Sequence, residues 1–196
     1  MKFRQTWTAI RALLIFSCVL GVGYPLAITG IGQLALNNQA NGQLLNVGGK
    51  VVGSAIIGQS FTDANGNALP EWFQSRPSAA GKGYDGGASS GSNYGPENAD
   101  LITAIHDRQA AIEQADGVSV DKIPADAVTA SASGLDPHIS PAYALLQVPR
   151  VAAARGLDEK RVNSLVQSMI QARDLGYLGE PTVNVLELNI ALAKLG

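Results

Sequence analysis

The stretch ALLIFSCVLGVGYPLAITGIGQLAL, residues 12–36, contains 25 residues without a charge and decides how the chain is organised. As a helix, at ~1.5 Å per residue, it extends ~37 Å and so exceeds the ~30 Å hydrocarbon core of a bilayer. Twelve of its residues are Leu, Ile, Val or Phe. Each contributes roughly −0.5 kcal/mol to insertion, which outweighs the penalties from Pro25, Gln33 and four glycines. The stretch predicts a transmembrane helix.

The charges around this stretch predict its orientation. Lys2, Arg4 and Arg11 precede it, and the positive-inside bias keeps such residues in the cytoplasm. We therefore expect a cytoplasmic tail (1–11), a single transmembrane helix (12–36) and a periplasmic domain (37–196) at the cell inner membrane. All 16 acidic residues lie after position 62, so the exported part is acidic, which excludes a nucleic-acid-binding protein. These scattered acids favour a solvated face over a cation-binding site.

A cleaved signal peptide also begins with basic residues before an apolar run. Here the run continues for 11 residues beyond Pro25, and Ala27-Ile28-Thr29 ends on a residue too bulky for a cleavage site. We therefore expect the helix to be retained. Gly23 and Ala27 form a small-xxx-small pair that lets another helix approach, and Pro25 frees a backbone carbonyl. Both features predict a partner helix in the bilayer.

The exported part is predicted to be an α+β domain that is helix-rich in its second half. Glycines, prolines and polar residues predict a link at 37–49 and a long loop at 62–96. Val and Ile enrichment predicts a strand at 50–58, and a second, looser strand is expected at 122–133. Apolar periodicity predicts four further segments. These are helices at 98–115, at 141–148 up to Pro149, from Asp158 to Gly176 or Gly179, and at 182–195.

Two patterns resemble catalytic sites. Asp136, His138 and Ser140 have the side chains of a nucleophilic triad, but their spacing is too short for one, and Ser140-Pro141 matches a helix N-cap. Gly87 to Gly91 fits G-x-S-x-G with Ser89 as nucleophile, but no strand or helix flanks it. His138 also lacks a neighbouring metal ligand. A non-catalytic protein is favoured, and the alternative is a free exported serine hydrolase with a cleaved signal peptide.

Several motifs resemble the C subunit of the bacterial potassium-transporting P-type ATPase, the Kdp complex. They are VGSAIIGQSF (52–61), SRPSAA (75–80), SGSN (90–93), TASASGLDPHISPAYALLQVPRVAAARGL (129–157) and GEPTVNVLELNIAL (179–192), together with GVGYP in the apolar stretch. The resemblance covers nearly the whole chain in order. No D-K-T-G-T sequence, which marks the phosphorylated aspartate of a pump subunit, occurs in this chain.

The resemblance implies an accessory subunit of an ATP-driven, high-affinity potassium uptake complex. Its partners would be a potassium-translocating subunit, an ATP-hydrolysing P-type subunit and a small single-helix subunit, besides the lipid bilayer. It would bind no cofactor or metal by itself, while the complex uses ATP, Mg and K ions. As a catalytic chaperone it would raise the ATP affinity of the pump subunit. The candidate partner-contact residues are Gly23, Pro25, Ala27, Gln59, Arg76, Pro77, Asn93, Asp136, His138, Pro149 and Arg150.

Overall fold

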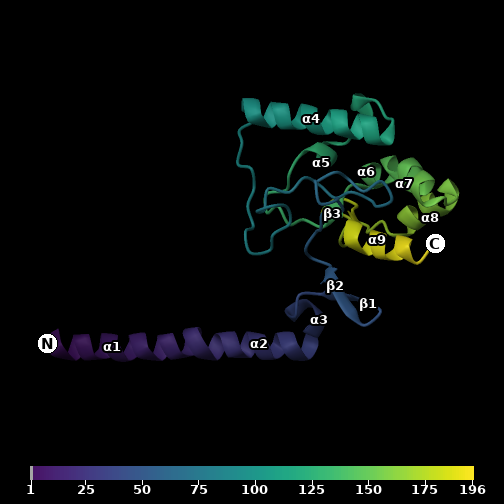
Figure 1. The fold of residues 1–196 in the computed structure, drawn as a ribbon. Coiled ribbons are helices and arrows are strands. Elements are labelled where there is room, and N and C mark those ends of the chain that lie inside the picture. Colours follow the sequence, from purple (N-terminus) through teal and green to yellow (C-terminus); the bar gives the residue numbers. More distant parts are fainter. Residues whose placement is uncertain (1) are drawn as a thin grey trace. The chain divides into compact units, whose positions relative to one another are not determined.

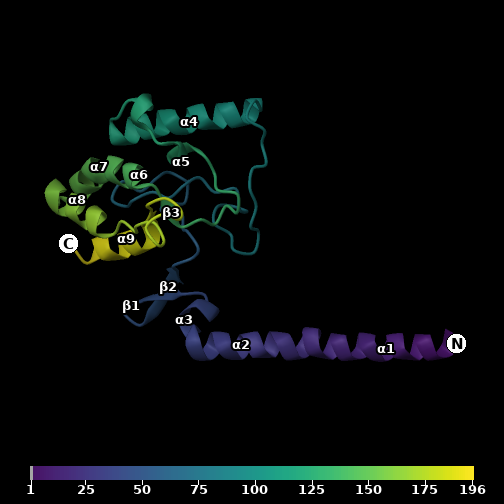
Figure 2. The same cartoon turned by 180° about the vertical axis from the view of Figure 1, so that it is seen from behind.

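The computed structural model describes residues 2–196 and contains two compact units, Met1–Leu44 and Leu45–Gly196. The first unit is a long apolar helix, and the second is a small mixed domain with most of its helices late in the chain (Figures 1 and 2). This confirms the predicted fold class. Met1, the first residue of the predicted cytoplasmic tail, lies outside the described residues.

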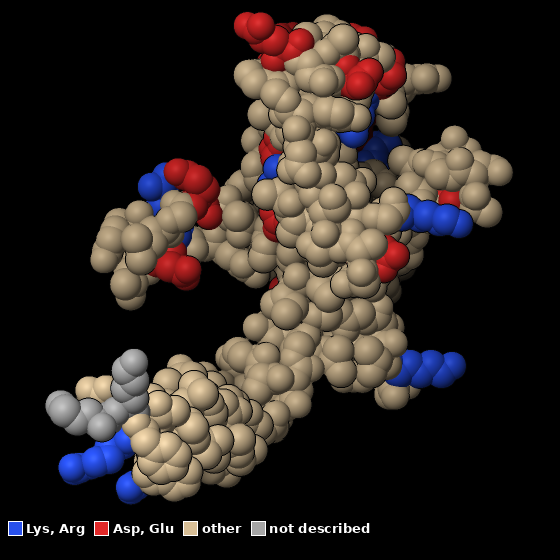
Figure 3. Space-filling view, turned by 90° about the vertical axis from the view of Figure 1, so that its left-hand side faces the viewer, with Lys and Arg blue, Asp and Glu red and all other residues tan. Residues whose placement is uncertain are grey.

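The first unit is dominated by one uninterrupted helix that is long and apolar enough to cross a membrane, Phe3–Ala35. It consists of α1 (Lys2–Cys18), a π-helical turn η1 (Val19–Gly23) and α2 (Tyr24–Ala35). In η1 the Tyr24 N–H donates to the Val19 carbonyl, five residues back. Pro25, which has no N–H to donate, is the second residue of α2 and lies just after this turn. In Figure 3 the helix surface is uncharged except near its N-terminal end.

The helix ends in a cluster of amide side chains. α2 stops at Ala35, and a single turn, α3 (Asn37–Ala40), follows it. The Gln33 Oε1 accepts hydrogen bonds from Asn37 Nδ2 and Asn41 Nδ2, both at 3.1 Å. These amides supply polar partners where the apolar run ends.

The prediction of an irregular link at 37–49 is wrong in part, because α3 and the strand β1 (Leu44–Val47) lie within it. β1 pairs with β2 (Lys50–Ser54) across the two-residue turn Gly48-Gly49. Both glycines have positive φ, 58° and 80°, as a two-residue hairpin turn requires. β2 is shorter than the predicted strand 50–58, because a tight turn closed by a bridge between Ser54 and Ile57 follows it.

Residues 55–98 contain no named helix or strand, and this range includes the predicted loop at 62–96. Part of the segment is nevertheless core. Phe73 and Ala80 are fully buried. The Phe73 N–H donates to Asn189 Oδ1 at 3.0 Å, and Asn189 Nδ2 donates back to the Phe73 carbonyl at 2.9 Å. Gln147 makes the same two bonds with Gln74, at 2.6 and 3.2 Å. Two buried carboxamides thus replace the neighbouring strand that an extended backbone normally needs.

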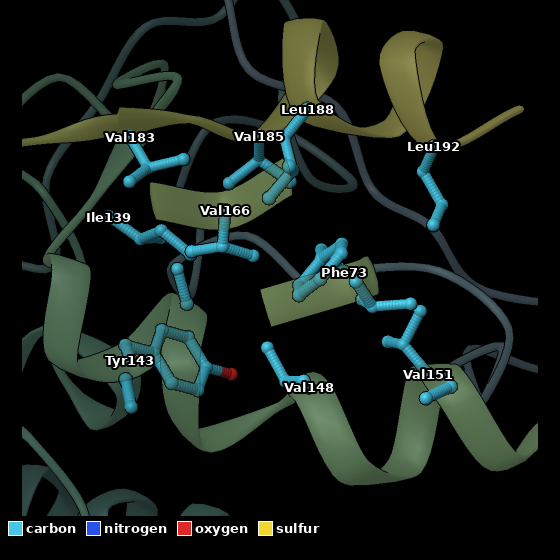
Figure 4. Close-up of a cluster of buried hydrophobic side chains, with 14 of the residues drawn as sticks. Phe73, Ile139, Tyr143, Val148, Val151, Val166, Val183, Val185, Leu188 and Leu192 are labelled. Carbon is cyan, nitrogen blue, oxygen red and sulfur yellow. The ribbon is translucent and has the colours of Figure 1, made fainter. Parts of the chain in front are cut away.

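The hydrophobic core is built mainly from the last third of the chain around Phe73 (Figure 4). Its helices are α6 (Pro141–Leu146), α7 (Val148–Arg155), α8 (Glu159–Ser168) and α9 (Val185–Ala193). Ser140 caps α6 by accepting from the Tyr143 N–H, Pro149 opens α7, and Asp158 caps α8. The predicted starts at Ser140 and Asp158 are confirmed. The predicted helix up to Pro149 does end before that residue, at Leu146, but the separate helix α7 that begins at Val148 was not predicted. α4 (Ala99–Asp116), capped by Asn98, packs on the core through partly buried Ile105 and Ile112.

Two predicted elements differ from the structure. The expected strand at 122–133 is wrong: a 3-10 turn η2 (Val120–Lys122) and a short helix α5 (Ala125–Val128) occupy it, since its Ala, Ser and Thr side chains are too small to bury a sheet face. The helix that starts at Asp158 ends at Ser168 and not at Gly176 or Gly179. Gln171 and Thr182 exchange two backbone hydrogen bonds, which folds 171–182 into a hairpin-like excursion.

A short antiparallel pair links two distant motifs. β3 (His138–Ile139) pairs with β4 (Val183–Asn184), with His138 opposite Asn184 and Ile139 opposite Val183. The Asn184 side chain also donates to the Ala55 carbonyl at 2.7 Å. The sequence GLDPHISP is therefore held beside GEPTVNV, although about 45 residues separate them.

Candidate functional site

Three loop segments converge on residues 133–138, which we call the junction. The Gly58 N–H donates to the Leu135 carbonyl at 2.9 Å. The Ser78 hydroxyl donates to the Gly134 carbonyl at 2.6 Å. The Ser90 N–H and the Ser89 hydroxyl both donate to the Ser133 carbonyl, at 3.0 and 2.9 Å. Segments 52–61, 75–80 and 90–93, which resemble one family in sequence, thus meet at one place.

Glycine is required at the centre of the junction. Gly134 is buried and has φ +66°, and a Cβ there would lie 2.6 Å from the Ser90 carbonyl oxygen and 2.7 Å from the Ala80 nitrogen. Gly58 is equally confined, since its Cβ would meet the Tyr84 ring at 2.3 Å. The loops approach the junction so closely that no side chain fits between the backbones.

An ionic group lies on the partly exposed side of the junction. Arg76 Nη1 is 3.1 Å from Asp136 Oδ2, and His138 Nδ1 is 3.3 Å from Asp136 Oδ1. Burial opposes ionisation of Asp136, but hydrogen bonds from the His138 ring and backbone N–H and the Arg76 charge outweigh it. The pKa of Asp136 therefore lies below its ordinary value, and the carboxylate is charged at neutral pH. Arg76 Nε is buried without a hydrogen-bond partner in the described residues.

Tyr84 holds the backbone of Arg76 in place. The sequence did not predict this role. The Tyr84 hydroxyl donates to the Arg76 carbonyl at 2.7 Å, and its N–H donates to the Ser78 hydroxyl at 2.8 Å. Burial raises the pKa of Tyr84 to about 12, so the hydroxyl stays protonated and donates. The signal in the sequence was an aromatic residue within an otherwise small and polar loop.

Ser140 and Ser89, the two candidate nucleophiles, make hydrogen bonds that hold parts of the fold together. The Ser140 hydroxyl donates to Asp126 Oδ1 at 2.9 Å, and the Ser140 N–H donates to Asp126 Oδ2 at 2.6 Å. The proton of this hydroxyl therefore goes to Asp126 and not to His138, while its oxygen caps α6 by accepting from the Tyr143 N–H. Ser89 donates to a backbone carbonyl, and no strand or helix flanks it. Within the described residues, neither serine hydroxyl hydrogen-bonds to a histidine, the usual base of a serine nucleophile.

Other candidate contact residues are dispersed. Gln59 donates to the Val52 carbonyl at 2.8 Å and so belongs to the hairpin side of the domain. Pro77 is partly buried beside Arg76. Asn93 is exposed in the loop before α4 and has φ +55°, and Pro149 is exposed at the start of α7. Gly23, Pro25 and Ala27 lie exposed in the apolar helix of the first unit.

Arg150 lies inside the domain rather than on its surface, with 9% of its side chain exposed. Its Nε is 2.7 Å from Asp116 Oδ1, and its other nitrogens donate to the Pro70 and Trp72 carbonyls and to Gln147. Burial raises the pKa of Asp116, against the opposing effect of the Arg150 charge. Arg150 joins α7 to the end of α4 and to the segment before Phe73.

Within residues 2–196, no three His, Cys, Asp or Glu side chains are placed together to hold a metal ion. The junction contains the Asp136 carboxylate and the His138 imidazole, and the Arg76 guanidinium pairs with the carboxylate. Within the described residues, the hydroxyls of Ser89 and Ser140 donate to other groups. The geometry of the junction suits recognition of a polar or charged surface.

Comparison with known proteins gives one consistent result. A family model described as "KdpC: K+-transporting ATPase, c chain" matches residues 6–194. The potassium-transporting ATPase KdpC subunit of Kineococcus radiotolerans is 52% identical over 189 residues, covering 96% of this chain and 93% of the relative. That of Mycobacterium tuberculosis is 50% identical over 193 residues, covering 98% and 99%. That of Caulobacter vibrioides is 54% identical over 186 residues, covering 94% and 90%.

Proposed function

Because the chain belongs to the KdpC family and is a non-catalytic subunit of the Kdp potassium-transporting P-type ATPase, we propose that it raises the ATP affinity of the pump subunit by coupling through membrane helices. The match over nearly the full chain, residues 6–194, is the observation that carries this proposal. In this role the chain assembles with the potassium-translocating, ATP-hydrolysing and small single-helix subunits. ATP, Mg and K ions are used by the complex and not by this chain alone.

Orientation is the first element of the proposal. Three basic residues precede the apolar stretch, so the N-terminus lies in the cytoplasm and residues 37–196 lie in the periplasm. The ~30 Å hydrocarbon core then separates the domain from ATP, which rules out direct contact between them. Only the first residues of the chain reach the cytoplasm.

The chain's single cysteine, Cys18, makes orientation testable. In a Cys18→Ser background, Asn93→Cys places a thiol on an exposed loop of the domain, and Gln5→Cys places one before the apolar stretch. A membrane-impermeant maleimide added to intact spheroplasts should label the first variant and not the second. The opposite labelling pattern overturns the proposed orientation.

Coupling is the second element. A subunit that binds one arrangement of the pump more tightly shifts the population toward that arrangement, and nucleotide that prefers the same arrangement then binds more tightly. The effect is reciprocal and typically amounts to ~1–3 kcal/mol. Gly23, Ala27 and the π-helical turn before Pro25 supply a face of small residues and an irregular backbone for a partner helix.

The third element is that the junction forms part of the surface toward the partner subunits. Arg76 and Asp136 offer charged groups, and His138 offers an imidazole, on segments that are fixed by backbone hydrogen bonds. His138→Ala should weaken assembly while leaving the ATPase turnover of the assembled complex near normal. A thousandfold loss of turnover in complex that still assembles would instead point to proton transfer by His138.

A further inference from the structure

The hairpin of β1 and β2, together with the turn after it, exposes several large apolar side chains. We call residues 45–58 the apolar hairpin. Val47, Val51 and Ile56 are 41%, 57% and 51% exposed, although they lie within ten residues of one another in the chain. A single exposed apolar residue is ordinary on a soluble surface, but a group of them indicates a surface that binds a partner or a membrane.

The apolar hairpin is held on the domain by specific contacts. Gln59 Nε2 donates to the Val52 carbonyl at 2.8 Å. A Cβ on Gly53 would lie 2.7 Å from Leu186 Cδ2, so the backbone of β2 packs directly against α9. The hairpin therefore presents its apolar side chains from a preformed surface, and binding through them requires little further ordering of the chain.

Charge distinguishes the apolar hairpin from the rest of the domain. Between Ala12 and Thr62, Lys50 is the only charged residue, and all 16 acidic residues lie beyond this range. Lys50 is exposed at the start of β2. Lysine is depleted where two proteins meet, whereas near a membrane surface each lysine is attracted by anionic lipid headgroups. The charge pattern therefore favours lipid over a protein as the partner of this surface.

A second group of exposed apolar residues has the opposite surroundings. Leu175 and Tyr177, in the excursion 171–182, are even more exposed than Val51. This excursion carries two acidic residues and one basic residue, so its net charge is negative and an anionic lipid surface repels it. Apolar exposure is thus common to both segments, but only the apolar hairpin combines it with a positive charge and no acidic residue.

The position of the apolar hairpin in the chain keeps it near the bilayer. β1 begins at Leu44, nine residues after the membrane-anchoring helix ends at Ala35. Nine residues span at most ~30 Å even when they are fully extended. The anchor therefore keeps the hairpin at a high effective concentration beside the lipid, so that even a weak affinity for the bilayer is sufficient.

We propose that the apolar hairpin lies in the interfacial layer of the bilayer, with Val51 and Ile56 at the upper acyl chains and Lys50 at the lipid phosphates. This contact attaches the domain to the membrane at a second point and limits its rotation about the anchoring helix. The inference requires the membrane anchor, but neither the orientation nor the coupling proposed above.

A nitroxide spin label on the full chain, reconstituted in nanodiscs that contain anionic phospholipid, tests this contact. In a Cys18→Ser background, Val51→Cys places the label on the apolar hairpin, and Leu175→Cys places the same label on the excursion. The label at position 51 should collide readily with oxygen, which concentrates in lipid, and poorly with a water-soluble nickel chelate. The label at position 175 should show the reverse, which excludes an effect of the label itself.

Two further substitutions, each combined with the label at position 51, separate the apolar and the electrostatic contributions. Ile56→Asn should lower the ratio of docked to undocked hairpin about tenfold, whereas Ile102→Asn, at an exposed apolar residue of α4, should leave it unchanged. Lys50→Gln should lower the ratio about fivefold in anionic nanodiscs and leave it unchanged in nanodiscs of neutral lipid.

Three outcomes overturn the proposal. One is nickel access at position 51 equal to that at position 175, both in the chain alone and in the assembled complex. Another is unchanged protection of position 51 in Ile56→Asn. The third is protection that appears only when the other subunits are added, which assigns this surface to a protein partner instead. None of these outcomes bears on the proposed orientation, because the hairpin can reach the bilayer from either side.

Discussion

The apolar helix of the first unit and the core of the second are both built from apolar residues, but only those of the core are buried within the chain. None of the most apolar window of Phe3–Ala35 is buried within the chain, whereas Val162, Val166 and Leu188 of the domain are fully buried. The helix therefore depends on lipid and on other subunits for its packing. The domain depends on close internal approach of loops to the junction and on its buried amides. Substitutions in the two regions should accordingly have separable effects.

The largest effect is expected at the junction, with Gly134→Ala. The added Cβ combines a left-handed φ with overlap of the Ser90 and Ala80 backbones, and together these should lower the free energy of unfolding by about 3–5 kcal/mol. Gly117→Ala is the matched control, since Gly117 has the same φ of +66° but nothing within 4 Å of its Cβ position. Chemical denaturation of both variants measures the difference. Equal losses would mean that the close approach at the junction contributes nothing.

The buried amides should rank second. Asn189→Leu leaves the Phe73 N–H and carbonyl without partners, which should cost about 2–4 kcal/mol in the free energy of unfolding. Gln167→Leu, on the exposed face of α8, should change it by less than about 0.5 kcal/mol. If Asn189→Leu is as stable as the control, apolar burial alone holds Phe73 in place.

These amides also mark the limit of prediction from sequence. Periodicity and capping residues predicted the apolar helix and the starts of α6 and α8, because those signals are local. Gln147 and Asn189 are single polar residues in apolar runs, and their partners lie 73 and 116 residues away in a segment without periodicity. The junction likewise depends on loops meeting in space, so its motifs were visible but their convergence was not. Arg150 was placed among the contact candidates, and its inward ion pair with Asp116 was not foreseen.

A smaller and pH-dependent effect is expected for Asp136. Its pKa is lower in the folded chain than the ordinary 3.8, so the folded state binds fewer protons than the unfolded state near that pH. The stabilisation is therefore complete above pH ~4 and is lost as the pH falls through the folded pKa. Asp136→Asn should remove this acid dependence and cost about 1 kcal/mol at neutral pH, since the group is partly exposed. Unfolding midpoints at pH 6 and pH 3 test it, and parallel pH profiles for both proteins contradict it.

The smallest effect on domain stability is expected from the helix. Gly23→Leu should leave the unfolding of residues 45–196 unchanged within about 0.5 kcal/mol, because the two units form separate clusters of contacts. It should nevertheless weaken assembly about tenfold by blocking close approach of a partner helix. Val22→Leu, on an exposed position of the same turn, is the control. Normal assembly of Gly23→Leu would show that this face is not a contact.

The measurement that tests the account most directly is the affinity of this subunit for the rest of the complex, with and without a non-hydrolysable ATP analogue. Coupling through the membrane is reciprocal, so the analogue should tighten assembly by about 5–150-fold. Identical affinities in the two conditions would contradict coupling between this chain and the nucleotide site.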